Sequence, residues 1–191
     1  DASSSRFGST EVYYNENSDE YSDWTPGQGY LDATKSERDM IDLVCSNFDN
    51  VVLVYNGANA LNLSFVEDCP QIKGVVWAPP AGQTGFDALG SILKGDVNPS
   101  GRATDTFLRD FSQAPWHNNI GSYQYTNMSD YHVDQMFGSS DPTYVNYVEG
   151  IYVGYKYYET AAAEGVLDYD AAVQYPFGYG LSYTTFDWSN Y

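Results

Sequence analysis

Apolar residues recur along the chain with the spacings of alternating helices and strands. Thr34-Lys35-Ser36-Glu37 has the spacing of a helix capping box. The apolar positions that follow share one helix face and predict a helix that ends at Asp49-Asn50; they are Met40, Ile41, Val44, Cys45 and Phe48. The continuous β-branched run Val51–Tyr55 then predicts a strand that is buried on both faces.

A second unit of strand and helix follows the first. Residues 61–66 predict a short helix that stops before Pro70, and residues 73–78 predict a strand. The loop 79–82, Pro-Pro-Ala-Gly, allows neither element to continue. The next helix begins near Gln83, and its apolar face consists of Phe86, Leu89, Ile92 and Leu93. Gly95 fits the left-handed residue that closes such a helix, and Asn98-Pro99-Ser100-Gly101 predicts a turn.

This alternation predicts the fold class. We expect an α/β protein, a three-layer sandwich in which helices flank a mostly parallel sheet, with long irregular loops added. A strand that runs into a glycine-rich loop and a helix places that loop at the carboxyl end of the sheet, where ligands of open α/β folds gather. The strand, loop and helix of residues 73–107 are therefore the centre of the predicted fold.

The remaining stretches have weaker periodicity. Residues 1–33 are rich in Ser, Asp, Glu, Gly and Tyr, and residues 108–147 are rich in Pro, Gly, Asn and Asp, so both are predicted as long loops. The aromatic block 151–158 alternates as a strand does, but Tyr152, Tyr155 and Tyr158 also fit a helix stripe, and both alternatives stand. Residues 161–172 predict a loop with a short helix.

Composition excludes several classes of partner. Lys and Arg number 8 against 26 Asp and Glu, which gives a net charge of −18. Phosphate recognition needs clustered cations, so we expect no nucleic acid partner, and the same charge argues against an anionic membrane surface. Neutral sugars are compatible with this charge. Most of the 19 Tyr are expected to serve packing, although flat rings with a polar edge are also what sugar sites use.

Metal and disulfide chemistry is not expected. Cys45 and Cys69 are the only cysteines and make no metal pattern, and Cys45 is expected to be a buried thiol. His117 and His132 are separated and lack companion ligands, so we expect surface histidines and no metal site. We expect no cofactor. No membrane-spanning run or signal peptide is visible, which favours a cytoplasmic parent.

Two long blocks resemble the second, C-terminal domain of glycoside hydrolase family 3, the family of many β-glucosidases. The first runs from Trp77-Ala78-Pro79-Pro80-Ala81-Gly82-Gln83-Thr84-Gly85 to the sequence Gly-Asp-Val-Asn-Pro-Ser-Gly-Arg of residues 95–102. The second comprises residues 149–158, Glu-Gly-Ile-Tyr-Val-Gly-Tyr-Lys-Tyr-Tyr, and residues 175–186. The resemblance covers nearly the whole chain. It implies that residues 1–191 are one domain of a longer parent and that 175–191 lead toward a further domain.

The resemblance also implies how the catalytic groups are divided. In this family the nucleophile is an aspartate of a preceding barrel domain, and the acid/base is commonly a glutamate on a loop of the second domain. The nearest stretch here is Ser5-Arg6-Phe7-Gly8-Ser9-Thr10-Glu11-Val12, which departs from the family pattern in its glycines and its aspartate. Glu11 is the predicted acid/base, Glu16 and Glu20 are the next candidates, and Arg6 is predicted to position the loop or bind sugar hydroxyls.

The sequence thus predicts part of a retaining, exo-acting β-glucosidase-like hydrolase. This chain would supply the acid/base loop and one wall of the cleft, with the N-terminal barrel domain of the same parent as partner and a carbohydrate as substrate. Alone it is expected to be inactive. The alternative is a non-catalytic module that binds carbohydrate or serves as a scaffold. Asp96 and Arg102, which flank the predicted turn, are expected to form a local ion pair.

Overall fold

The computed structural model describes residues 23, 28–29, 31–117, 126–127, 130, 133–136, 138–140, 147–187 and 189. The elements follow one another as α1 (Lys35–Asn47), β1 (Val51–Tyr55), η2 (Ser64–Val66), β2 (Ile72–Trp77), α2 (Phe86–Lys94), β3 (Phe107–Leu108), η3 (Phe111–Gln113), β4 (Val133–Gln135), β5 (Gly138–Ser140), α3 (Tyr155–Ala163), α4 (Tyr169–Ala172) and β6 (Val173–Tyr175). None of the described helices has the length and apolar composition needed to cross a membrane.

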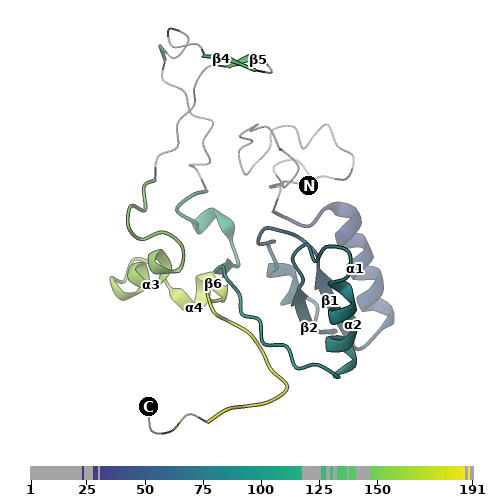
Figure 1. Ribbon diagram of the computed structural model, residues 1–191. Coiled ribbons are helices and arrows are strands. Elements are labelled where there is room, and N and C mark those ends of the chain that lie inside the picture. The colour runs from purple at the N-terminus through teal and green to yellow at the C-terminus, as the bar shows by residue number, and fades with distance from the viewer. Residues whose placement is uncertain are drawn as a thin grey trace.

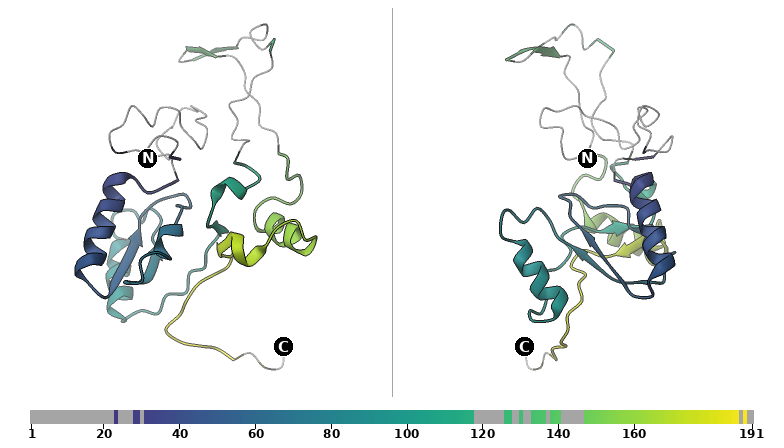
Figure 2. Two further views of the ribbon diagram at one scale, coloured as in Figure 1. Left: turned by 180° about the vertical axis from the view of Figure 1, so that it is seen from behind. Right: turned by 90° about the vertical axis from the view of Figure 1, so that its right-hand side faces the viewer.

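The centre of the fold is a parallel strand pair between two helices. β1 and β2 pair in parallel, with Leu53 opposite Val75 and Tyr55 opposite Trp77. In the right-hand view of Figure 2, α1 lies on one side of this pair and α2 on the other. The α/β class is therefore confirmed, with helix, sheet and helix as successive layers. The other two described strand pairs, β3 with β6 and β4 with β5, are short and antiparallel.

Local sequence determines where α1 begins. The Thr34 hydroxyl accepts a hydrogen bond from the Glu37 backbone N–H at 3.3 Å, and the Glu37 carboxylate accepts one from the Thr34 N–H at 2.8 Å. This reciprocal pair is the predicted capping box, which satisfies donors that the first turn leaves unpaired. Ile41 and Cys45 form the buried stripe of the helix, whereas Met40 is 55% exposed. The buried face is narrower than the apolar pattern predicts.

β1 is buried less completely than its sequence predicts. Val51 and Leu53 pack against the core, but Val52 on the opposite face is 51% exposed. The prediction of burial on both faces is therefore wrong for Val52. An apolar run in the sequence does not reveal which face of the strand the other elements cover. In the part of the chain that the structure describes, they leave the face that carries Val52 partly open.

The helix α2 ends at the predicted residue, but the segment after it differs from the prediction. Gly95 has a φ of 86°, and its N–H bonds the Ile92 carbonyl. Residues 98–101 form an irregular segment instead of a turn. The predicted ion pair between Asp96 and Arg102 is also wrong. Asp96 pairs with Lys94 at 2.8 Å, and Arg102 donates to the carbonyl of Gly180.

Phe107 in β3 connects the helix–strand half to the C-terminal half. It is 3% exposed and lies edge-on to Trp77 of β2, with ring centroids 5.5 Å apart. It also lies edge-on to Tyr175 of β6 at 6.1 Å. Because β3 also pairs with β6, this one side chain packs against strands from both halves of the chain.

Arg109 holds the same junction through polar contacts. Its Nε donates to both carboxylate oxygens of Glu67, at 3.1 and 3.0 Å. Its Nη1 donates to carbonyls at the end of α4, those of Asp170 at 2.7 Å and Val173 at 2.7 Å among them. The Glu67 carboxylate raises the pKa of Arg109 further above its ordinary value. One guanidinium therefore joins the loop after η2 to the end of α4.

The aromatic block resolves as a helix. Tyr155 begins α3, and Gly154 before it has a φ of 71°, so the helical alternative is right from Tyr155 onward. Residues 148–151 form turns instead. α4 is the short helix expected within 161–172.

The two cysteines lie together in the core. Cys45 and Cys69 are both buried free thiols, as expected for Cys45. Burial, followed by the neighbouring Cys45 thiol, raises the pKa of Cys69. A thiol held neutral in this way is a poor nucleophile.

Candidate functional site

The residues predicted to carry catalysis lie outside the described part of the chain. Arg6, Glu11, Glu16 and Glu20 all belong to the segment before residue 23, the first residue described. Their roles stay predictions. Within the described residues, the candidate site is a pocket at the carboxyl end of β1.

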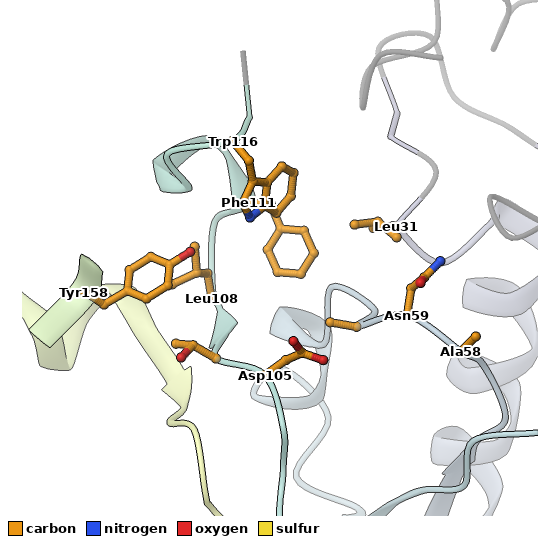
Figure 3. Close-up of a pocket in the computed structure, with 10 residues that line it drawn as sticks. Leu31, Ala58, Asn59, Asp105, Leu108, Phe111, Trp116 and Tyr158 are labelled. Carbon is orange, nitrogen blue, oxygen red and sulfur yellow. The ribbon is translucent and has the colours of Figure 1, made fainter. Parts of the chain in front are cut away.

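This pocket has a volume of about 220 Å³ and is assembled from five separate parts of the chain. It is lined by Leu31, Ala58, Asn59, Ala60, Asp105, Thr106, Leu108, Phe111, Trp116 and Tyr158. Figure 3 shows the carboxylate of Asp105 at its floor and the rings of Phe111 and Trp116 above. The location agrees with the general rule that ligands of open α/β sheets bind beyond the carboxyl ends of parallel strands.

Hydrogen bonds from the end of the sheet fix the loop of residues 58–60. The strand stops at Asn56-Gly57, where the Asn56 amide donates to the Ala78 carbonyl at 2.7 Å. The Trp77 indole N–H donates to the Gly57 carbonyl at 2.9 Å. The Tyr55 hydroxyl donates to the Asn59 backbone carbonyl at 2.6 Å. The loop is therefore held at both its start and its middle, which positions one wall of the pocket.

Several polar side chains of the pocket have no hydrogen-bond partner among the residues that the structure describes. Among the residues that the structure describes, none hydrogen-bonds to the Asp105 carboxylate, the Asn59 side-chain amide or the Thr106 hydroxyl. The Thr106 Oγ1 is in addition shielded from water. A buried hydroxyl without a partner costs about 1–3 kcal/mol, whereas Asp105 and Asn59 are exposed and can meet a ligand directly.

The opposite wall is aromatic and rigid. Phe111 and Trp116 lie edge-on to each other, with centroids 5.8 Å apart. Tyr158 from α3 is 5% exposed, and Leu108 is 1% exposed. The pocket thus combines a carboxylate, an amide and a hydroxyl with flat apolar surfaces, which is the composition of a site for a small polar molecule with apolar faces.

The pocket is not suited to a metal. Among the described residues no group of three or more His, Cys, Asp or Glu side chains is close enough to hold an ion. The ring nitrogens of His117 are shielded from water, so the predicted surface position is wrong for this histidine. Its backbone N–H donates to the Ala114 carbonyl at 3.1 Å. His132 lies outside the described residues.

Sequence reasoning did not identify the pocket residues. Asn59 follows a predicted parallel strand within four positions, and that placement was a usable signal. Asp105 and Thr106 precede a strand of only two residues, Phe107–Leu108, which has no periodicity to detect. Trp116 and Tyr158 are separated by a long insertion, so only the tertiary fold brings them together.

High pH is expected to destabilise the protein through Tyr158. Burial above all, with smaller contributions from Tyr157 and Glu149, raises the pKa of Tyr158 from 10.0 to about 12. Because the folded pKa exceeds the unfolded one, the neutral hydroxyl contributes stability that is fully present below pH 10 and is lost as the pH rises through about 12. Urea unfolding at several pH values should show a smaller alkaline loss for Tyr158→Phe.

The matched control is Tyr147→Phe, since Tyr147 is 71% exposed. This variant should follow the wild-type pH dependence. Burial shifts the pKa values of Tyr55, Tyr169 and Tyr175 in the same direction as that of Tyr158, so some alkaline loss remains in Tyr158→Phe. Equal pH dependence for wild type and Tyr158→Phe would contradict the assignment.

Comparison with protein families decides where the chain belongs. The model of the glycosyl hydrolase family 3 C-terminal domain matches residues 7–155. The chain belongs to glycosyl hydrolase family 3. The resemblance of residues 77–102 to this family is thereby confirmed, and every pocket residue except Tyr158 lies within the matched range.

Individual family 3 proteins agree with this assignment. The chain is 37% identical over 160 residues to beta-glucosidase A of Butyrivibrio fibrisolvens, covering 84% of this chain and 16% of the relative. It is 34% identical over 175 residues to beta-glucosidase B of Emericella nidulans, covering 88% and 19%. The crystal structure of a beta-glucosidase from Paenibacillus barengoltzii matches with a TM-score of 0.64 and 32% identity, covering 86% of this chain and 15% of that one. The chain thus spans less than a fifth of these relatives.

Proposed function

We propose that this chain is part of a retaining, exo-acting glycoside hydrolase of the β-glucosidase type. The observation that carries the proposal is the family 3 C-terminal domain match over residues 7–155, together with relatives that are named beta-glucosidases. The domain would supply the acid/base loop and one wall of the cleft, while the rest of the parent supplies the remainder of the site.

The chemistry requires two carboxyl groups about 5–5.5 Å apart on either side of the scissile bond. The nucleophile attacks the anomeric carbon and is expected from the N-terminal barrel domain of the parent. The acid/base gives its proton to the departing oxygen and then takes one from water as water displaces the enzyme. Glu11 is proposed for this second role, and Arg6 for holding the loop or a sugar hydroxyl.

Exposed apolar side chains support a partner domain on the described surface. Val148, Ile151 and Val153 are 61%, 79% and 55% exposed and lie in or beside the turn before α3. A cluster of this kind is unusual on an isolated domain and is typical of a surface that another domain covers. Because this chain covers only 16% and 19% of the relatives' own lengths, the rest of the parent is the proposed occupant.

The proposal is tested by comparing the parent enzyme with this chain alone. We expect the parent to hydrolyse 4-nitrophenyl β-glucoside, and proton NMR should show the β anomer of glucose as the first product, since the mechanism retains configuration. The isolated chain should release no nitrophenol because it lacks the nucleophile. A first product in the α form would exclude the retaining mechanism, and turnover by the isolated chain would show that the nucleophile lies within it.

A further inference from the structure

We propose that the pocket at the carboxyl end of β1 binds a single neutral sugar ring, with Asp105 and Asn59 as the main hydrogen-bonding groups. The presence of the pocket does not depend on the proposed function. The choice of a sugar as ligand rests on that function in part, and on the chemistry of the lining for the rest.

The polar groups of the pocket match those of a polyol. A carboxylate only accepts hydrogen bonds, whereas an amide and a hydroxyl both donate and accept. The Asp105 carboxylate and the Asn59 amide have no partners among the described residues and are exposed, so both are available to a ligand. Neighbouring hydroxyl groups on a pyranose ring can donate to Asp105 and at the same time exchange hydrogen bonds with Asn59.

The apolar part of the pocket matches the faces of the ring. Phe111 and Trp116 are fixed by their mutual edge-on contact, and Leu108 adds apolar surface beside Tyr158. A pyranose presents its C–H groups on its faces and its hydroxyls at its rim, so it can place apolar surface against the rings while its rim reaches Asp105. Flat aromatic side chains provide such surface at a low entropy cost because they are already packed.

Three other ligand classes fit less well. Anions are disfavoured because no Lys, Arg or His lines the pocket and the chain carries a net charge of −18. Metal ions are disfavoured because the described residues contain no suitable ligand group. An organic ammonium ion would suit a carboxylate beside aromatic rings, but it offers no hydroxyl groups to the Asn59 amide, which can both donate and accept hydrogen bonds.

The size of the pocket limits the ligand to one ring. Its volume of about 220 Å³ is below the roughly 300–1,000 Å³ of pockets for drug-sized ligands. A site of this size would hold a monosaccharide, or one terminal unit of a longer chain. With so few contacts we expect dissociation constants on the order of millimolar.

The test measures D-glucose binding to this chain directly. Proton–nitrogen NMR titration should give saturable shifts in the amides of Asn59, Asp105 and Thr106, and saturation-transfer signals on glucose should confirm contact. Asp105→Asn removes the strongest acceptor and should weaken binding by about tenfold or more, because hydrogen bonds to a charged group are stronger than those to a neutral one. Ala58→Trp should abolish binding by filling the pocket, since Ala58 is an exposed lining residue.

Asp49→Asn is the matched control, because Asp49 is exposed and lies outside the pocket. It makes the same change of charge and should leave the affinity unchanged. Equal affinity for wild type and Asp105→Asn, shifts confined to other residues, or binding of tetramethylammonium in place of glucose would each overturn the proposal. The two proposals can fail separately. If the parent hydrolyses glucosides while this chain binds no glucose, only the sugar pocket is refuted. If this chain binds glucose while the parent hydrolyses no glucoside, only the proposed function is refuted.

Discussion

Replacing Glu11 by Gln in the parent enzyme is expected to lower the hydrolysis of unactivated glucosides by about 10²–10⁴-fold, the usual contribution of a general acid–base. With 2,4-dinitrophenyl β-glucoside the leaving group departs without a proton, so the glycosyl–enzyme should still form. It should then accumulate, because no base remains to activate water. Azide needs no base, displaces the enzyme from the anomeric carbon, and should restore turnover with formation of β-glucosyl azide.

Glu16→Gln and Glu20→Gln are the matched controls for this experiment. Each removes one carboxylate from the same acidic stretch, so a general effect of lost charge would appear in all three variants. Azide rescue in Glu16→Gln or Glu20→Gln alone would transfer the acid/base role to that residue. Unchanged turnover in all three would remove the acid/base from this domain and favour the scaffold alternative.

Phe107→Ala is expected to destabilise the folded chain by about 3–5 kcal/mol, the usual effect of removing a buried phenylalanine side chain. Phe107 is 3% exposed, and its ring is the contact between Trp77 and Tyr175. Its removal therefore leaves a cavity and also separates β2 from β6. A loss of this size is a large share of the 5–15 kcal/mol that typically stabilises a domain.

Urea unfolding followed by circular dichroism measures this effect. Phe107→Leu should cost less than Phe107→Ala because much of the volume remains. Phe186→Ala is the exposed control, since Phe186 is 75% exposed, and it should stay within about 0.5 kcal/mol of wild type. A loss below 1 kcal/mol for Phe107→Ala would mean that the two halves of the chain are stabilised separately.

Elements with local signals were predictable from sequence, and elements that depend on distant partners were not. The start of α1 follows from Thr34 and Glu37, and the end of α2 follows from Gly95, because each signal lies within four residues of the structure that it determines. The pairing of β3 with β6 has no such signal, since each strand has only two or three residues. The partner of Arg102 was missed for the same reason: Gly180 lies 78 positions away.

The residues of the candidate site show the same difference between local and distant signals. The family was recognisable from contiguous blocks around Trp77 and Asn98, because each block is a run of neighbouring residues that can be read without the fold. The acid/base assignment has only a loop motif as its basis, and Glu11 departs from that motif in its flanking residues. The pocket could not be derived from sequence, because Asn59, Asp105 and Tyr158 meet only after the two halves of the chain pack against each other.

The Arg109 contacts close a long loop, since this residue bonds the carbonyl of Val173, 64 positions along the chain. The entropy of closing a flexible loop grows only logarithmically with its length, by about 0.6 kcal/mol for each doubling. The number of residues between Arg109 and Val173 can therefore change with little effect on the free energy of closing this loop.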